Sequence, residues 1–360
     1  MSHPYRGLPS FQFWNTGVTQ APPGALDPMT GAKFQIRPGE KVATMGSCFA
    51  QHISRHLVKR GLSYFITENG DPKSSHETLA ARNYGVFSAR YGNVYTVRQG
   101  IQLIDRAFGD FVPAEEVWET AVGYVDPYRP QIEPVAWKTA DEVNKSRDVH
   151  LAAVRQIFLE SDVLVFTLGL TETFMSRKDG AVFPVAPGVS GGSFSPDAYE
   201  FKNFSAAEVI EDLHVFIAKA RKLNPNLRII LTVSPVPLIA TFEPRHVLFS
   251  TTISKAILRV AADEITKVYD FVEYFPSYEI ISGSAIGASY FENDLREVRQ
   301  VGVDHVMRVF EKHMLHSSVS ETAGTPYTSP QATHVANVVC DEEMIMKTLN
   351  ESGLPDSSIQ

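Results

Sequence analysis

The stretch Asp162-Val-Leu-Val-Phe-Thr-Leu-Gly-Leu-Thr-Glu172 decides the fold class. Its residues 163–168 form an apolar run of strand length, as expected where a strand is buried on both faces of a parallel sheet. Arg228-Ile-Ile-Leu-Thr-Val233 is a second such run. An amphipathic helix is predicted between them over 205–223, and Ser205-Ala-Ala-Glu208 at its start has the spacing of a capping box. Strands that alternate with helices in this way predict βαβ units.

The same alternation continues on both sides of these two strands. Lys41-Val-Ala-Thr-Met45 predicts a strand, and a helix follows over 48–60, with Gly61 where a helix stop is expected. The remaining pattern predicts one further strand at 269–274 and helices at 99–108, 141–161, 250–268, 302–315 and 335–349. We therefore expect an α/β protein with three layers built around a parallel sheet.

Three segments are expected along the chain. An irregular N-terminal arm occupies 1–40, and a main domain at 41–316 contains an insertion at about 62–150 between its first two sheet strands. A connector and a helix follow at 317–360. No internal repeat is visible.

Composition restricts the class of protein. Of the 360 residues, 44% are hydrophobic and 21% are charged, which is typical of a soluble globular chain. The formal net charge of −8 argues against a nucleic-acid partner. Cys48 and Cys340 are the only cysteines, too few for a disulfide framework or a zinc site. Because no signal-peptide pattern and no apolar stretch of about 20 residues occurs, we expect a cytoplasmic protein without a membrane span.

The ends of the predicted strands locate a site. Ligands of doubly wound sheets bind at the carboxyl ends of the strands, which here read Met45-Gly-Ser-Cys48, Leu168-Gly-Leu-Thr-Glu172 and Val233-Ser-Pro-Val-Pro237. Ser47 lies between a strand and a helix, which is the position of a nucleophile whose oxyanion a helix N-terminus helps to hold. Two alternatives are that Ser47 only caps the helix and that Cys48 is the nucleophile.

The pentapeptide Gly46-Ser-Cys-Phe-Ala50 resembles the motif that names the GSCFA family, of the GDSL/SGNH hydrolase superfamily of α/β serine esterases and acyltransferases. Matching segments follow in order over about 40–310: Asn83-Tyr-Gly85, Thr167-Leu-Gly-Leu-Thr-Glu172, Phe201-Lys-Asn-Phe204, Ser234-Pro-Val236 and Tyr274-Phe-Pro-Ser-Tyr-Glu-Ile280. The resemblance implies a flavodoxin-like SGNH fold with an insertion and a C-terminal helical extension.

The resemblance also implies site residues. Ser47 matches the nucleophile, and its N–H belongs to the oxyanion hole together with the N–H of Gly85, for which Gly92 is the alternative. The family's Gly-x-Asn-Asp block corresponds to Gly169-Leu-Thr-Glu172, so Thr171 stands where the Asn donor belongs. Threonine can still donate, with a shorter reach.

The last block of the superfamily, Asp-x-x-His, corresponds to Asp294-Leu-Arg-Glu297. Glu297 therefore stands in the histidine position, where a carboxylate is a weaker base near neutral pH. His305 is the nearest imidazole, so either His305 or Glu297 is expected to take the proton of Ser47, with Asp294 orienting the base.

Other polar residues are weaker candidates. His76 and His246 are reserve bases, Asn83 and Ser234 belong to matching segments, and Glu172 is either an acid/base group or a loop holder. His52 and His56 have metal-ligand spacing but no third ligand nearby, which favours two surface residues. We expect no metal and no cofactor.

The predicted function is a serine esterase or O-acyltransferase acting on small-molecule or carbohydrate acyl esters, with water or a sugar hydroxyl as acceptor. The resemblance favours O-acyl groups on carbohydrate, although no residue identifies a sugar. Because two of the four blocks depart from the pattern, the alternative is a non-catalytic SGNH-fold binding protein in polysaccharide assembly. The oligomeric state stays open.

Overall fold

A computed structural model describes residues 3–22, 24–287, 289–317 and 340–351. The strands are β1 Val42–Gly46, β2 Trp118–Thr120, β3 Gly123–Val125, β4 Val163–Leu168, β5 Glu172–Ser176, β6 Val182–Phe183, β7 Tyr199–Asn203, β8 Arg228–Val233 and β9 Val272–Tyr274. The helices are α1 Ala50–Lys59, α2 His76–Ala81, α3 Val97–Phe108, α4 Ala140–Glu160, α5 Ala206–Leu223, α6 Val247–Val268, α7 Ser277–Ser282, α8 Gln300–Met314 and α10 Glu343–Glu351. Two short helical turns, η1 Ser10–Gln12 and η2 Asn15–Thr19, precede them.

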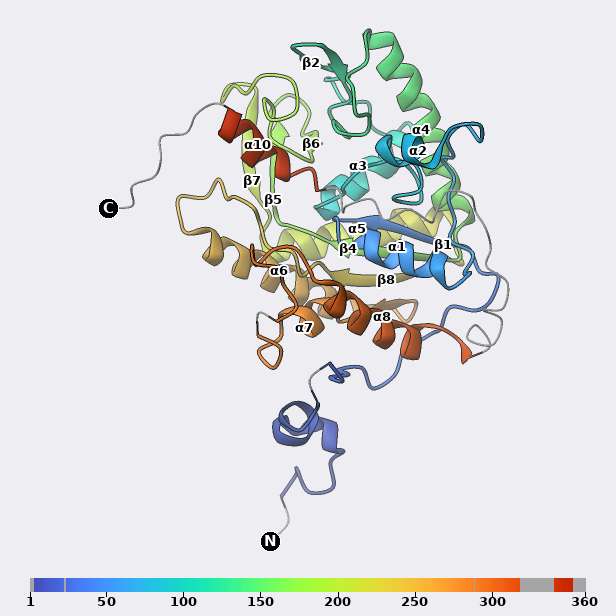
Figure 1. Ribbon diagram of the computed structural model, residues 1–360, viewed down its shortest axis with the longest axis vertical. Helices are drawn as coiled ribbons and strands as arrows, with labels where there is room; N and C mark the ends of the chain where they lie inside the picture. Colours follow the sequence, from blue (N-terminus) through green and yellow to red (C-terminus); the bar gives the residue numbers. More distant parts are fainter. Residues whose placement is uncertain (1–2, 23, 288, 318–339, 352–360) are drawn as a thin grey trace.

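The central sheet has the strand order β1-β4-β8-β9, and all its neighbours are parallel (Figure 1). Gly46 at the end of β1 lies opposite Thr167 of β4, and Leu168 lies opposite Val233 of β8. The carboxyl ends of the first three strands therefore meet at one edge, as the sequence predicts.

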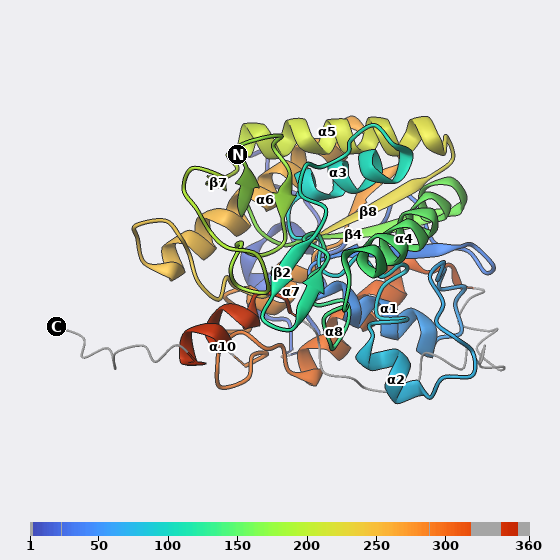
Figure 2. The same cartoon turned by 90° about the horizontal axis from the view of Figure 1, so that it is seen from above.

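Alternate residues of the sheet are buried under different helices. On one face, Leu164, Phe166 and Leu168 of β4 share a hydrophobic core with α3, α4, α5 and α6. On the other face, Val163 and Val165 pack with α1, α7 and α8. Figure 2 shows α3 and α5 on one side of the strands and α1 and α8 on the other. This burial on both faces explains why the strands are almost continuously apolar.

A second, antiparallel sheet has the order β6-β5-β7 and follows directly after the end of β4. The sequence analysis did not predict it. Its strands pair with one another rather than with the central sheet, and their burial does not follow a clean alternation. The sequence analysis also did not predict the short hairpin β2-β3.

The N-terminal arm contains η1 and η2 and is bound to the main body near α8 and β9. The Ile36 N–H donates to the carbonyl of Met314, and the Lys33 N–H donates to Glu273. The predicted insertion at about 62–150 contains α3, which packs on the central sheet. This segment also contains a buried ion cluster in which Glu68 lies near Arg90, Arg129 and His150.

The mixed α/β architecture with a parallel central sheet is confirmed. The predicted strands at 163–168 and 228–233 have the predicted bounds, and Ser205 opens α5 with a capping box. The first helix begins at Ala50 rather than at residue 48, because Ser47, Cys48 and Phe49 form a turn. The predicted connector beyond residue 317 and residues 335–339 of the predicted terminal helix lie outside the described residues, and α10 is described from Glu343.

Gly46 makes the turn after β1 possible. Its φ of 128° is in the region that favours glycine. A Cβ atom on Gly46 would lie 2.2 Å from the carbonyl oxygen of Thr167, so the backbones of β1 and β4 approach too closely for any side chain. The position of Ser47 therefore depends on this glycine.

We expect Gly46→Ala to lower the free energy of unfolding by about 2–5 kcal/mol, because a strained φ costs about 1–2 kcal/mol and overpacking costs about 1–3 kcal/mol. Gly39→Ala is the matched control, since Gly39 also has a positive φ but no atom within 4 Å of an added Cβ. Urea unfolding of both variants measures the difference. Equal losses would contradict the role given to the Gly46–Thr167 contact.

Candidate active site

The Ser47 side chain lies in the turn between β1 and α1 and is 2% exposed. The Ser47 N–H donates to the carbonyl of Thr167 at 3.0 Å, and the Ser47 carbonyl accepts from the Ala50 N–H at 2.9 Å. The Ser47 hydroxyl oxygen is buried and has no hydrogen-bond partner among the described residues.

This geometry decides between two interpretations of Ser47. The N-cap of α1 is Phe49, and no side chain caps that helix, so Ser47 is not a helix cap. The structure also corrects one oxyanion donor, because the Ser47 N–H is already bonded to Thr167. A buried hydroxyl without a partner is costly, because it loses its hydrogen bonds to water and gains none within the fold.

The segment Gly92–Tyr95 lies against this turn. The Val94 N–H donates to the carbonyl of Gly46, and the carbonyl of Tyr95 accepts from the Gly169 N–H at 3.0 Å. Asn93, which directly precedes Val94, is 1% exposed. Gly92 and Gly85 are the two candidates for the oxyanion hole. Of these two glycines, Gly92 is the one whose chain neighbours contact the end of β1, directly before Ser47.

Gly85 and Asn83 belong to a different contact. Among the described residues, Gly85 forms no backbone hydrogen bond with the Ser47 turn. The Asn83 side-chain amide donates to the carbonyls of Gln131 and Ile132 at 3.1 and 3.3 Å. Asn83 therefore holds a neighbouring loop.

The loop after β4 touches Ser47 through Gly169, where an added Cβ would lie 3.0 Å from the Ser47 Cβ. Thr171, two residues later, is fully buried, and its hydroxyl donates to the side-chain oxygen of Asn203 at 2.7 Å. Its N–H donates to the hydroxyl of Ser254. The structure thus corrects the role given to Thr171, because its hydroxyl proton already has an acceptor within the fold.

Lys255 on α6 is a buried cation in this region and is 1% exposed. Its ammonium nitrogen donates to the carbonyl of Gly169 at 2.8 Å, next to Ser47. Burial lowers the pKa of Lys255 to about 8, and the nearby charge of Glu342 opposes this shift. A lysine with such a pKa is partly neutral near pH 8, which a general base requires.

Residues 340–342, which precede α10, lie beside Asn93 and Tyr95. The Asp341 carboxylate accepts from the Asn93 N–H at 3.2 Å and from the Asn93 side-chain amide at 3.0 Å. The Glu342 N–H donates to the Tyr95 hydroxyl at 3.4 Å. Burial raises the pKa of Asp341, and it raises the pKa of Glu342 to about 7. We call residues 340–342 the C-terminal strap.

A cavity of about 290 Å³ lies on the α1 side of the strap, and we call it the thiol cavity. It is lined by Cys48, Phe49, His52, Val236, Asp294, Arg296, Glu297, Val298, Cys340 and Glu343. Asp294 and Glu297 are exposed side chains here, and the Asp294 carboxylate accepts from the Arg296 and Glu297 N–H groups at 3.0 Å. The fold thus brings Asp294 and Glu297 to the cavity of Cys48, the neighbour of Ser47.

His305 has a different role from the one proposed for it. Its Nε2 donates to the carbonyl of Leu26 at 2.7 Å, so its Nδ1 accepts from the Tyr290 hydroxyl at 2.8 Å. The side chain is 1% exposed, and burial lowers the pKa of His305. Because both ring nitrogens are engaged, His305 joins the N-terminal arm to α8 and has no free nitrogen for Ser47.

The reserve candidates are also engaged locally. Glu172 accepts from the Thr241 hydroxyl at 2.8 Å and from the Phe242 N–H, so it holds the loop at 241–242. The Ser234 hydroxyl accepts from the Val236 N–H, and exposed His246 caps α6. His76 begins α2.

The two histidines of α1 have separate surroundings. His56 bonds to Glu311, whereas His52 lines the thiol cavity, and burial lowers the pKa of His52 to about 4. Among the described residues, no three His, Cys, Asp or Glu side chains could together hold a metal ion. No helix in the described ranges is long and apolar enough to cross a membrane.

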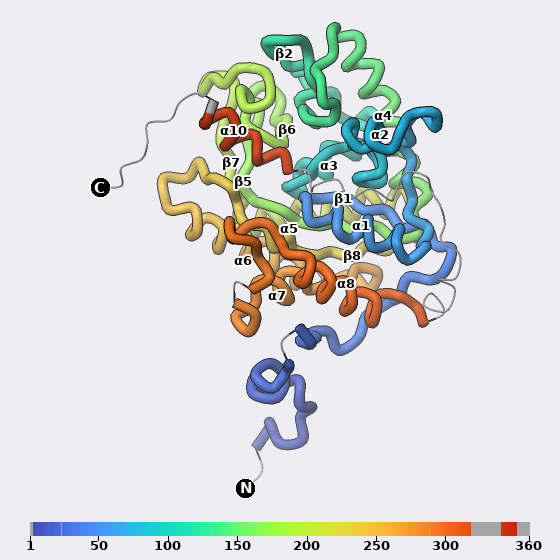
Figure 3. The backbone as a smooth tube through the Cα atoms, viewed as in Figure 1, coloured from blue at the N-terminus to red at the C-terminus, as the bar shows by residue number. Residues whose placement is uncertain are grey.

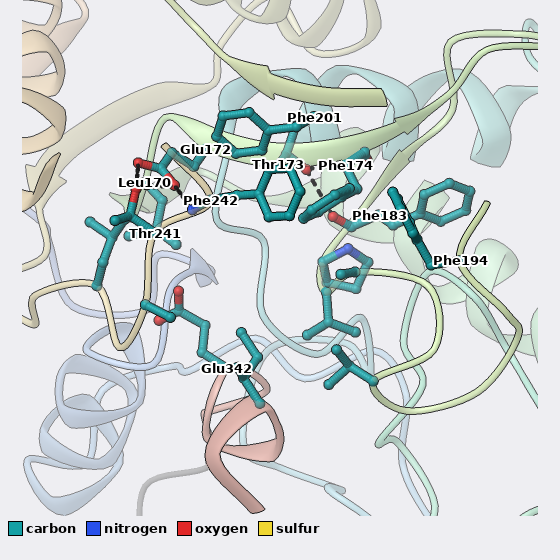
Figure 4. A pocket seen from close by; sticks show the side chains of 17 residues that line it. Leu170, Glu172, Thr173, Phe174, Phe183, Phe194, Phe201, Thr241, Phe242 and Glu342 are labelled. Atoms are coloured by element: carbon teal, nitrogen blue, oxygen red, sulfur yellow. Dashed lines mark hydrogen bonds between the residues drawn. The ribbon is translucent and has the colours of Figure 1, made fainter. Parts of the chain in front are cut away.

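A second cavity, of about 250 Å³, lies on the other side of the strap (Figure 4). Its walls are mostly phenylalanine and aliphatic side chains from the β6-β5-β7 sheet, and we call it the phenylalanine cavity. Leu170, directly after Gly169, and Glu342 of the strap stand at one end. Figure 3 shows α10 running past this sheet.

Sequence reasoning missed Asn93, Lys255 and the strap. Lys255 did carry a signal, because Lys255, Leu258, Ala262 and Ile265 share one helical face, and a lysine on an apolar stripe is unusual. The acidic residues after Cys340 carried none, since charged runs are normally exposed.

No curated protein matches the chain. A crystal structure of an acetyl esterase mutant with an acetate ion is 11% identical in sequence to this chain, with a TM-score of 0.29. The match covers 76% of this chain and 95% of the esterase chain. The model of the GSCFA family matches residues 41–310, so the chain belongs to the GSCFA family.

Proposed function

We propose that this protein is an SGNH-type serine esterase or O-acyltransferase in which Ser47 is the nucleophile. The observation that carries the proposal is the buried Ser47 hydroxyl, which has no partner among the described residues and lies at the carboxyl edge of the parallel sheet. A hydroxyl that neither caps the helix nor forms a hydrogen bond within the described residues is available to attack an acyl carbonyl carbon. The assignment of the chain to the GDSL/SGNH superfamily is part of the same proposal.

Lys255 is the proposed base. Its nitrogen bonds to the carbonyl of Gly169, whose Cα packs against Ser47, and no other lysine among the described residues is buried. In its neutral form Lys255 takes the Ser47 proton, and in its protonated form it returns that proton to the leaving oxygen. Glu297, which lines the thiol cavity, is the second candidate, because Asp294-Leu-Arg-Glu297 resembles the Asp-x-x-His block with Glu297 in the histidine position.

Asn93 supplies the proposed oxyanion donors. Its N–H and its side-chain amide converge on one carboxylate oxygen of Asp341 at 3.2 and 3.0 Å. Two preorganised donors aimed at one anionic oxygen are what a tetrahedral intermediate needs. In this proposal Asp341 leaves Asn93 when substrate binds.

The lining of the phenylalanine cavity supports a substrate whose acyl group is apolar. Its wall is formed by side chains such as Phe174, Phe183 and Phe201, which favour a hydrocarbon chain. Glu172 and Glu342 also line it, and their carboxylates disfavour an anionic fatty acid relative to its neutral ester. We therefore propose neutral acyl esters of medium chain length as substrates.

The strap favours a second candidate function. Because Asp341 occupies both donors of Asn93 and Ser47 is covered, the chain can instead be a non-catalytic SGNH-fold binding protein. The reaction of Ser47 with an electrophile separates the two functions.

We expect a fluorophosphonate probe to label the wild-type protein at Ser47, as mass spectrometry of the peptides would show, and to leave Ser47→Ala unlabelled. Ser47→Ala should also raise the free energy of unfolding by about 1 kcal/mol, because it removes a buried hydroxyl without a partner. Ser54→Ala is the matched control. The Ser54 hydroxyl donates to the carbonyl of Gln51 at 2.9 Å, so its loss should cost about 1 kcal/mol. Absence of labelling at every pH from 6 to about 10 would support the binding protein.

We expect kcat/KM for a p-nitrophenyl ester to rise with pH through about 8 and then level off, because only neutral Lys255 accepts a proton. Lys255→Met should lower kcat by about 100-fold or more and remove this rise, while its apolar side chain suits the buried position. Lys267→Met, on the exposed face of α6, is the control. If Glu297→Gln abolishes activity and Lys255→Met does not, Glu297 is the base.

We expect Ala186→Phe, which fills part of the phenylalanine cavity, to lower kcat/KM for p-nitrophenyl octanoate about 10-fold or more and to leave the acetate ester almost unchanged. Ala114→Phe, at an exposed position, is the control. Steady-state kinetics with esters of increasing chain length measures the profile. Equal losses for both esters would contradict the acyl assignment.

A further inference from the structure

The two cysteines meet at the candidate active site although they come from opposite ends of the chain. Cys48 follows Ser47 directly, and Cys340 begins the C-terminal strap. Both side chains are buried, both line the same cavity, and the neighbouring Cys48 raises the pKa of the Cys340 thiol. No other cysteine exists in the 360 residues, so each has one intramolecular partner.

Small oxidants can reach this pair. Cys48 and Cys340 both line the thiol cavity of about 290 Å³, which is far larger than a hydrogen peroxide molecule. Asp294, Glu297 and Glu343 line the same cavity and are its acidic groups, while Arg296 and His52 are its basic ones. A neutral oxidant is not repelled by these charges, whereas an anionic thiol reagent meets three carboxylates.

The residues after Cys340 show what a covalent link would hold. Asp341 is bound to Asn93, and the Glu342 N–H is bound to Tyr95, whose carbonyl also accepts from Gly169 beside Ser47. These contacts are hydrogen bonds, which a substrate can replace. A covalent bond at Cys340 would prevent residues 340–342 from moving away from Asn93.

We propose that Cys48 and Cys340 are a redox modification site, in which a peroxide forms a reversible disulfide that holds the strap over the Ser47 turn. The formation of the disulfide does not depend on the proposed acyl chemistry. Only its consequence, a slower reaction at Ser47, rests on the proposed function.

The chemistry balances in two steps. The Cys48 sulfur attacks one peroxide oxygen, the O–O bond breaks, and Cys48 becomes a sulfenic acid while one water is released. The Cys340 sulfur then attacks the Cys48 sulfur, the S–S bond forms, and the S–O bond breaks. The leaving hydroxide takes the Cys340 proton and becomes the second water. The two thiols lose two electrons, and the peroxide gains them.

The order of the two steps follows from the environment of Cys340. Its hydrogen bond with Cys48 and its burial raise the pKa of the Cys340 thiol well above the usual range. Thiolates, not thiols, attack peroxide, so Cys340 is the poorer first nucleophile. Cys340 therefore acts as the resolving cysteine.

Peptide mapping tests the disulfide directly. The full-length protein is treated with hydrogen peroxide, alkylated under denaturing conditions and digested with trypsin. We expect peptide 42–55 to be joined to peptide 313–347, with a mass two hydrogens lower than their sum, and to be released by dithiothreitol. Cys340→Ser should show no joined peptide and should retain sulfenic acid at Cys48. Oxidation of Cys48 to sulfinic acid in the wild type, with Cys340 still alkylated, would overturn the proposal.

Hydrogen exchange tests whether the link holds the strap. In the oxidised wild type, we expect the amides of residues 341–345 to exchange about 10-fold or more slowly than in the reduced protein, whereas peroxide should not change them in Cys340→Ser. Unchanged exchange in a protein shown to contain the disulfide would overturn the holding role.

Labelling of Ser47 by a fluorophosphonate adds the functional readout. We expect labelling of oxidised wild type to be about 10-fold slower and to recover with dithiothreitol. If the reduced protein is not labelled at all, the proposed serine chemistry fails, but the peptide map and the exchange rates still decide the redox site.

Discussion

The close approach of Gly46 to Thr167 is the constraint on which the candidate site depends. A parallel pair of strands normally leaves room for a Cβ atom, but here the backbone of Thr167 occupies that space. The chain can turn directly out of β1, because glycine alone tolerates both the contact and the positive φ. Ser47 is consequently placed at the edge of the sheet before α1 begins. The same carbonyl of Thr167 accepts a hydrogen bond from the Ser47 N–H. Close packing and a backbone hydrogen bond therefore both fix the turn.

Burial governs the electrostatics of this edge. Lys255 and Glu342 both lie in the interior, and loss of hydration moves their pKa values toward each other, to about 8 and about 7. Arg296, which lies 3.7 Å from Glu342, opposes the rise in the pKa of Glu342 but adds to the fall in the pKa of Lys255. The mutual attraction of the Lys255 and Glu342 charges opposes both shifts. Groups with pKa values near neutrality can exchange protons at little cost, which suits acid/base chemistry.

The strap divides the site into two cavities of different character. On one side are the two thiols and exposed carboxylates, and on the other are phenylalanine side chains. An ester that places its acyl group among the phenylalanines must bring its carbonyl past residues 340–342 to reach Ser47. The strap is therefore part of the proposed site itself, and its contacts with Asn93 have to be exchanged for contacts with substrate.

Local patterns in the sequence determined the parallel sheet, most of its helices and the position of Ser47. The apolar runs at 163–168 and 228–233 need two covering layers, and the Ser205 capping box sets the start of α5 without any distant contact. The proposed base and the proposed oxyanion donors could not be predicted in the same way. The motif spacing placed Glu297 in the histidine position and left His305 as the nearest imidazole, but tertiary packing engages both ring nitrogens of His305 with Tyr290 and the N-terminal arm. Only the tertiary structure brings Asn93, Lys255 and Cys340 beside Ser47, because the environment of a polar side chain depends on which distant segments bury it.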